Sequence, residues 1–127
     1  MKNLLNTHTL IWFLNGDEQL SLQARKAIEK RGAINFISIA SLWEMSIKTS
    51  LGKLEMLSPF YTIAALIDAN GFQILPITFA DTLVLMSLPF HHKYPFDRII
   101  IAQSINNNLS IISVDSYFEK YPIKLLW

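Results

Sequence analysis

Cysteine is absent from the 127 residues of this chain. Without thiols, disulfides, thiolate metal sites and cysteine hydrolases are excluded, and a cytoplasmic location is the default expectation. Glycine is scarce as well, with four residues, and none forms a G-x-G-x-x-G motif or a phosphate-binding loop that ends in Gly-Lys-Ser/Thr. No serine lies in a G-x-S-x-G motif. We therefore expect neither nucleotide-dependent chemistry nor a serine hydrolase.

Charge is also sparse. Charged residues make up 17% of the chain and sum to a net charge of +1, whereas apolar residues make up 51%. A protein that binds nucleic acid through many phosphates is usually strongly basic, so any attraction for RNA here must come from a local cluster or from metal ions. The apolar excess exceeds what one small core can bury and predicts a homodimer or a protein partner.

Long uncharged apolar runs are missing. The most apolar region, residues 62–90, is interrupted by Asp68, Pro76 and Asp81. Nothing approaches the roughly 18 residues of a membrane span, so we expect no membrane association. The N-terminal apolar residues have strand character and no cleavage site follows them, so no signal peptide is expected. The length predicts one domain, residues 1–127.

Apolar strand patterns alternate with helical patterns along the chain. Ser58 as N-cap, Pro59 at the first helical position and Gly71 just past the end frame one helix, and Ser21 and Thr78 are predicted N-caps of two others. We predict strands at residues 4–5, 33–39, 72–77 and 109–114, with an edge strand at 123–127, and helices at 7–14, 21–31, 40–54, 59–70, 79–88 and 95–108. The alternation predicts an α/β fold in which a mainly parallel sheet is covered by helices on both faces.

Three carboxylates and one amide occupy the positions where such folds bind ligands. Asn6 ends the first strand and Asp115 directly follows the fourth, while Asp97 lies in the first turn of a helix and Glu44 lies one turn into another. Because the carboxyl ends of parallel strands share one rim, we expect these side chains to converge. Oxygen ligands suit hard divalent cations, and paired cations are a recurring device for phosphodiester hydrolysis. The pattern indicates a metal-dependent phosphodiesterase.

Each of these residues also has a purely structural interpretation. Asp115 suits a turn, and Asp97 complements a helix dipole, which stabilises by about 0.3–1 kcal/mol. Glu44 suits an exposed i,i+4 pair with Lys48, which contributes roughly 0.2–0.5 kcal/mol. The residues alone leave both interpretations open.

The other polar residues are less informative. His91 and His92 are adjacent in a predicted loop and lack the i,i+4 spacing of zinc ligands, so we assign them to the loop. His8 suits either substrate contact or a helix cap. Five acids are assigned to the solvated surface: Glu29, Glu55, Asp68, Asp81 and Glu119.

Four segments together resemble a known family. They are LLNTHTLIWFL (4–14), SIASLWEMSIKTSLGKL (38–54), LPFHHKYPFDRIIIAQS (88–104) and IISVDSYFEKY (111–121). In this order, over essentially the whole chain, they resemble the PIN-domain ribonucleases of the VapC toxin type. The resemblance implies a three-layer α/β/α sandwich, a Mg²⁺- or Mn²⁺-dependent endoribonuclease, a homodimer and inhibition by a VapB-type antitoxin.

The resemblance also assigns roles to individual residues. The acidic quartet of such enzymes, which binds the metal and carries the catalysis, falls on Asn6, Glu44, Asp97 and Asp115. Two hydroxyl residues that often accompany the first and last acids correspond to Thr7 and Ser113. Arg98 corresponds to the basic residue after the third acid, where it would contact phosphate or form a surface salt bridge.

Two positions depart from the family pattern. Asn6 stands where the family has Asp, and Tyr94 stands where an acidic residue often precedes Pro-Phe-Asp. Asn keeps the shape and one oxygen but removes a negative charge, so we expect weaker metal binding and an inactive or weakened enzyme. Either the change was introduced to silence a toxic nuclease, or the protein has lost activity naturally and retains antitoxin binding.

Two rival functions remain. One is a non-catalytic module of the same fold that binds an antitoxin or RNA, with its acidic rim receiving a basic segment. The other is a metal phosphatase for small phosphoesters, which the absence of a strand-end D-x-D motif disfavours.

Overall fold

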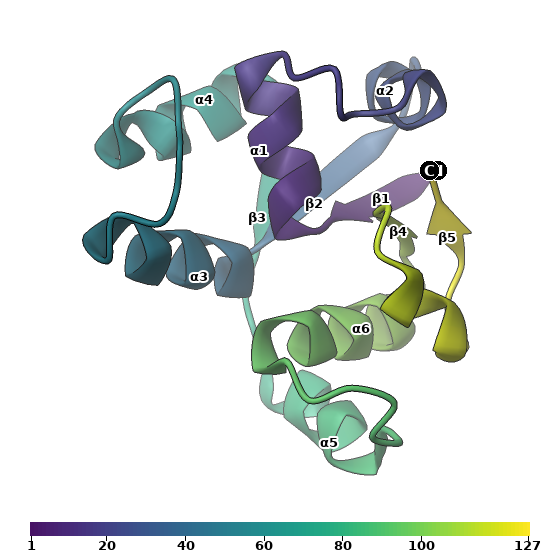
Figure 1. Ribbon diagram of the computed structural model, residues 1–127. Coiled ribbons are helices and arrows are strands. Elements are labelled where there is room, and N and C mark those ends of the chain that lie inside the picture. The colour runs from purple at the N-terminus through teal and green to yellow at the C-terminus, as the bar shows by residue number, and fades with distance from the viewer.

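Five parallel strands form the centre of the computed structural model, which describes residues 1–127 (Figure 1). Their order is β3-β2-β1-β4-β5, and every neighbouring pair is parallel. The strands are β1 (Lys2–Leu5), β2 (Ile34–Ser38), β3 (Gln73–Leu75), β4 (Ser110–Ile112) and β5 (Leu125–Leu126). The predicted parallel α/β sheet is confirmed.

Helices cover both faces of this sheet. They are α1 (Thr7–Asn15), α2 (Leu22–Glu29), α3 (Ile39–Ser50), α4 (Ile63–Ala69), α5 (Phe79–Ser87) and α6 (Pro95–Asn107), with short 3-10 helices η1 (Phe60–Thr62) and η2 (Ser116–Lys120). In Figure 1, α1, α2 and α4 lie on one side of the strands and α5 and α6 on the other. The predicted three-layer arrangement is therefore confirmed.

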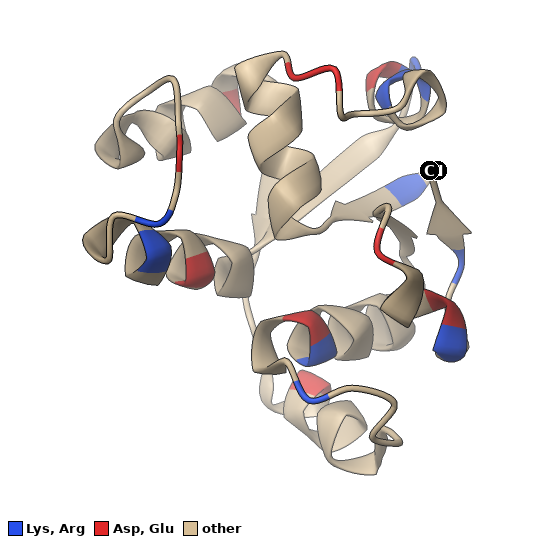
Figure 2. Cartoon of the chain, viewed as in Figure 1, with Lys and Arg blue, Asp and Glu red and all other residues tan.

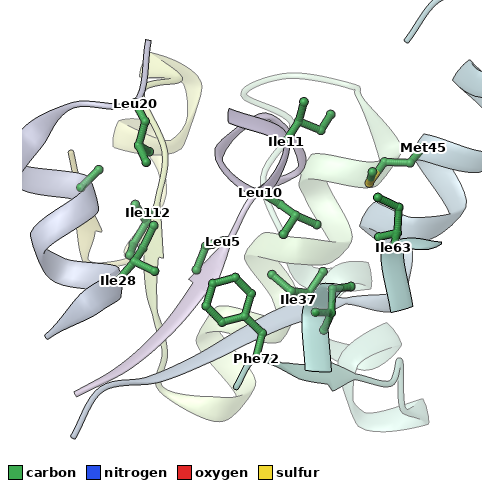
Figure 3. Packing of buried hydrophobic residues seen from close by; sticks show 12 residues of the cluster. Leu5, Leu10, Ile11, Leu20, Ile28, Ile37, Met45, Ile63, Phe72 and Ile112 are labelled. Atoms are coloured by element: carbon green, nitrogen blue, oxygen red, sulfur yellow. The ribbon is translucent and has the colours of Figure 1, made fainter. Parts of the chain in front are cut away.

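Alternation along the strands builds two separate cores. On β1, Leu5 belongs to a cluster with Leu10 and Ile37, whereas Leu4 belongs to a second cluster with Ile100. Figure 3 shows the first cluster, in which side chains from the strands and from the helices of one layer point toward one another. Because successive strand residues face opposite sides, an uninterrupted apolar strand is what a sheet covered on both faces requires.

The central strand β1 determines where a ligand site can lie. The chain runs from β1 outward to β2 and β3 and then returns to β4 on the other side of β1. This reversal leaves a crevice at the carboxyl ends of β1 and β4, which is where open α/β sheets bind ligands. Leu5 pairs with Ile112 at that edge, so Asn6 and Ser113 follow directly on the two sides of the crevice.

One predicted helix begins later than expected. Pro59 does not open an α-helix; its backbone is extended (ψ 146°), the 3-10 helix η1 follows, and α4 begins only at Ile63. Ser58 makes no capping hydrogen bond, whereas the Thr62 hydroxyl donates to the Pro59 carbonyl. The predicted stop is confirmed, because Gly71 has φ +72° and its N–H donates to the Asp68 carbonyl.

Asp81 is not a surface residue. Its side chain has 0% exposure and forms a capping box with Thr78 at the start of α5, and its second oxygen accepts a hydrogen bond from Asn106 Nδ2 at 2.8 Å. The sequence predicted the cap at Thr78 but not the contact with α6, because Asn106 is 25 residues away. Asp81, which the sequence assigned to the solvated surface, is therefore a buried contact between α5 and α6.

Large apolar side chains remain on the surface of two helices. On α3 they are Ile39, Trp43 and Ile47, and on α5 they are Phe79, Leu83 and Met86. Their spacing of three or four residues places each set on one helix face. The predicted apolar surface is therefore present. No helix is long and apolar enough to cross a membrane.

Candidate active site

A cavity of about 410 Å³ opens at the carboxyl ends of β1 and β4. Figure 2 shows acidic positions on α3, at the start of α6 and in the segment after β4, all close to the point where β1 passes into α1. The lining residues are Asn6, Thr7, His8, Glu44, Lys48, Tyr94, Asp97 and Asp115. The structure thus brings the four predicted ligand positions to one cavity.

Asn6 links β1 to α1 as a helix N-cap. Its Oδ1 accepts a hydrogen bond from the Thr9 backbone N–H at 3.1 Å, and the Thr9 hydroxyl lies 2.6 Å from the same oxygen. The Thr9 hydroxyl also lies 2.8 Å from the carbonyl of Ile112, so α1 is held against the end of β4. Aspartate caps a helix about as well as asparagine, so the local structure accommodates either residue.

Glu44 is buried and is held by three donors. Thr7 Oγ1 donates to Oε1 at 2.6 Å, the Tyr94 hydroxyl donates to Oε2, and Lys48 Nζ lies 3.1 Å from Oε2. The predicted i,i+4 pair with Lys48 exists, but it is not an exposed pair, because Glu44 is only 3% exposed. Burial raises the pKa of Glu44, yet the three hydrogen bonds and the charge of Lys48 outweigh burial and lower the pKa below its ordinary value.

Asp97 has the opposite environment. It lies in the first turn of α6, its side chain accepts no hydrogen bond, and its nearest basic partner is His92, with Nε2 3.6 Å from Oδ2. Burial, followed by the negative charges of Asp115 and Glu44, raises the pKa of Asp97 to about 7. Lys48 opposes this shift only in part. The cavity therefore carries more negative charge than its own side chains neutralise.

Asp115 combines the two interpretations that its sequence position allowed. Its Oδ1 accepts a hydrogen bond from the Tyr117 N–H at 3.0 Å and caps η2, and its own N–H donates to Ser113 Oγ at 3.0 Å. At the same time it lines the cavity together with Asp97. Turn formation thus orients this carboxylate toward the crevice and does not compete with a role there.

Arg98 does not contact the cavity, which corrects both predicted roles. It is 5% exposed, and its guanidinium donates to the carbonyls of Leu88, Pro89 and His92 and to the Tyr121 hydroxyl, at 2.9–3.3 Å. Consecutive helix residues point about 100° apart, so the residue after Asp97 faces away from the acids. Arg98 therefore anchors the segment before α6 and is available neither to phosphate nor to a surface salt bridge.

Two contacts were not predicted. Tyr94 reaches Glu44, and His92 lies between Asp97 and Tyr121, with Nδ1 2.8 Å from the tyrosine hydroxyl. The sequence offered a signal for the first, because Tyr94 departs from the family pattern. For His92 no sequence signal exists, because its partners come from α6 and from the C-terminal segment.

The side-chain oxygens of the cavity are of the kind that binds divalent cations, but the carboxylates do not surround a common point. Carboxylate and amide oxygens are the ligands that Mg²⁺ and Mn²⁺ prefer, and burial, followed by the charges of Asp115 and Glu44, raises the pKa of Asp97. No three His, Asp or Glu side chains, however, are placed closely enough to hold a metal ion together. Asp97 and Asp115 are the carboxylates least engaged by other donors.

Comparisons with known proteins agree with this architecture. A family model described as the PIN domain matches residues 4–124. No curated protein sequence matches the chain. The chain is similar to VapBC2 from Rickettsia felis bound to a DNA fragment from their promoter, with a TM-score of 0.73 at 13% identity, covering 98% of this chain and 97% of that one.

Two further solved structures are similar. One is a toxin-antitoxin complex from Klebsiella pneumoniae, with a TM-score of 0.65 at 20% identity, covering 94% of this chain and 92% of that one. The other is the PIN domain endonuclease Utp24, with a TM-score of 0.52 at 15% identity, covering 94% of this chain and 74% of that one. At these identities the likeness establishes the fold.

Proposed function

Because the chain belongs to the PIN domain family, whose model matches residues 4–124, we propose that it is the nuclease toxin of a toxin–antitoxin pair. Its substrate is RNA, its cofactor is Mg²⁺ or Mn²⁺, and its location is the cytoplasm. The observation that carries this proposal is the cavity at the carboxyl ends of β1 and β4, where Glu44, Asp97 and Asp115 meet position 6.

The cofactor assignment follows from the charge in this cavity. Asp97 and Asp115 would hold the cation, because their oxygens have the fewest competing donors. Position 6 would add a side-chain oxygen from the same cavity. When bound, such a cation neutralises the carboxylates and the phosphodiester and activates water. Residue 6 caps α1, which keeps its side chain at the crevice. Asp115 caps η2, and this turn keeps its side chain at the same crevice.

Asn6 is expected to silence or weaken this chemistry. Its Oδ1 already accepts from Thr9, and it lacks the negative charge that an aspartate would add to the cation site. We therefore expect the Asn6→Asp variant to cleave RNA in Mg²⁺ or Mn²⁺ and the chain with Asn6 to be slower by at least about 100-fold, the order of magnitude by which loss of one preorganised electrostatic contact lowers a rate.

The test compares RNA cleavage by the two proteins on a broad set of RNAs, with and without a chelator. The matched control is Asn6→Asp combined with Asp97→Asn, which should be inactive although its net charge equals that of the chain with Asn6. If Asn6→Asp cleaves no RNA, or cleaves equally well in the chelator, the proposed enzyme is wrong.

A second candidate function is a non-catalytic module of the same fold that binds an antitoxin or RNA. Asn6 and the full engagement of Glu44 by its three donors favour it, because both reduce the number of oxygens free for a cation. In this case the acidic cavity would receive a basic side chain of the partner. Metal-dependent cleavage by Asn6→Asp would exclude this candidate.

The proposed partners are a VapB-type antitoxin and a second copy of the chain. The similar structures from Rickettsia felis and Klebsiella pneumoniae are toxin–antitoxin complexes, which supports an antitoxin partner. The exposed apolar faces of α3 and α5 support a homodimer.

A further inference from the structure

Glu44 differs from the other acids of the cavity in how completely its carboxylate is occupied. Its three donors come from three different elements: Thr7 from α1, Lys48 from α3 itself, and Tyr94 from the residue that precedes α6. A carboxylate buried to 3% exposure and held by three donors is one whose oxygens are not free to bind a cation.

Asp97 and Asp115 are engaged far less. Asp97 accepts no hydrogen bond, and Asp115 accepts one, from a backbone N–H to a single oxygen. Glu44 is therefore held by its donors, whereas Asp97 and Asp115 have oxygens available to a cation. This division agrees with the finding that no three acidic or histidine side chains are gathered closely enough to hold a metal.

Tyr94 is the donor that can be removed with the least change in packing. Its ring lies 5.7 Å from the ring of Phe96, and Lys48 Nζ lies 5.9 Å from its centroid, so neighbours place the ring independently of the hydroxyl. Thr7 Oγ1, in contrast, also lies 3.0 Å from the buried Ser41 hydroxyl, and Lys48 carries a charge. The Tyr94 hydroxyl can therefore be removed while its neighbours keep the ring in place.

We propose that Tyr94 is a positioning residue whose hydroxyl, with Lys48, holds Glu44 out of the metal-binding set. A divalent cation is then bound through Asp97 and Asp115, and Glu44 joins these ligands when the Tyr94 hydroxyl is absent. The inference rests on the proposed function, because it concerns the same metal site. It assigns the tyrosine, which replaces an acid of the family pattern, a role in limiting cation affinity.

The test measures Mn²⁺ binding without RNA, by calorimetry and by the electron paramagnetic resonance of free Mn²⁺. Four proteins are compared: the chain itself, Tyr94→Phe, Glu44→Gln and the double variant. Loss of a hydrogen bond to a charged group frees Glu44 to bind, so Tyr94→Phe should bind Mn²⁺ about tenfold more tightly or better. Glu44→Gln alone should change the Kd by less than about threefold, and the double variant should lose the gain.

Two controls isolate the cause. Tyr61→Phe makes the same chemical change at an exposed residue of η1 and should leave Mn²⁺ binding unchanged. Asp97→Asn should weaken binding strongly, because this acid is an available ligand. Thermal unfolding of each variant checks that all of them remain folded.

The outcomes separate this inference from the proposed function. Equal Mn²⁺ binding by the chain and Tyr94→Phe, or no measurable binding by either, overturns the inference. A gain in Tyr94→Phe that persists in the double variant overturns it as well, because Glu44 would not be the ligand released. Unchanged binding by Asp97→Asn overturns the proposed metal site itself.

Discussion

The pKa of Asp97 reflects its burial and the charges around it. Burial and the neighbouring charges of Asp115 and Glu44 raise its pKa to about 7, whereas an aspartate in the unfolded chain titrates at about 3.9. Lys48 and His92 are the only basic groups that face it. Because the folded pKa is the higher one, the contribution of Asp97 to stability is full below about pH 4 and is lost as pH rises through about 7.

This pH dependence gives a prediction for the metal-free protein. In a chelator, Asp97→Asn should raise the free energy of unfolding by on the order of 2–3 kcal/mol more at pH 8 than at pH 5, because most of the interval between the two pKa values lies between these pH values. Thermal or urea unfolding of both proteins between pH 5 and 8 measures this difference. Asp68→Asn, at an exposed acid of α4, is the control and should not alter the slope. Identical slopes for the chain and Asp97→Asn would contradict the account.

Arg98 acts at the scale of elements, because it joins α6 to the segment that leads into it. Its guanidinium satisfies carbonyls of Leu88, Pro89 and His92 and packs 4.2 Å from the centroid of the Phe90 ring. The buried guanidinium thereby fixes residues 88–94, which form no helix or strand. That stretch also carries His92 toward Asp97.

Replacing Arg98 should therefore loosen the entry to α6. Arg98→Met removes four hydrogen bonds and leaves the Leu88 carbonyl and the Tyr121 hydroxyl without their buried donor, so we expect the free energy of unfolding to fall by about 2–4 kcal/mol. Arg98→Lys should recover little of this loss, since an ammonium cannot reproduce the planar fork of donors. Urea unfolding provides the measurement.

The matched control is Arg25→Met. Arg25 forms an exposed i,i+4 salt bridge with Glu29 at 3.2 Å, which should contribute less than about 0.5 kcal/mol. A comparable loss in both variants would show that the buried position of Arg98 is not the reason for its effect.

At the scale of the whole molecule, α3 and α5 each expose an apolar face. Trp43 on α3 is 61% exposed, and Phe79 and Met86 on α5 are each 78% exposed. An apolar pocket lined by Trp43 of α3, Leu85 of α5 and Phe96 of α6 adjoins the α3 face. Exposed apolar surface of this kind is characteristic of a protein interface.

We expect this surface to form the homodimer contact. The double variant Phe79→Glu, Met86→Lys should weaken self-association by at least about 100-fold, because it places charges in an apolar contact while matching the dipole of α5 at both ends. Analytical ultracentrifugation at micromolar concentrations measures the change. Leu57→Lys, at an exposed apolar residue between α3 and η1, should leave the dimer intact. A monomeric starting protein would refute the prediction.

Several features of the protein were determined by sequence alone. The apolar strands, the caps at Ser21 and Thr78 and the stop at Gly71 predicted the order of elements and the parallel sheet, because period and capping are local properties. The placement of Asn6 and Asp115 at strand ends predicted that they meet at one rim. Topology alone enforces that meeting, since carboxyl ends of parallel strands share an edge.

Only the tertiary structure decided what surrounds these residues. Two of the three donors on Glu44, Thr7 and Tyr94, lie 37 and 50 positions away, and Arg98 turns toward carbonyls rather than toward the acids. The sequence could not predict these contacts, because local pattern fixes which element carries a residue but not which long-range partner occupies its side chain. Burial, hydrogen bonding and pKa depend on those partners, so the chemistry of the cavity exists only in the folded chain.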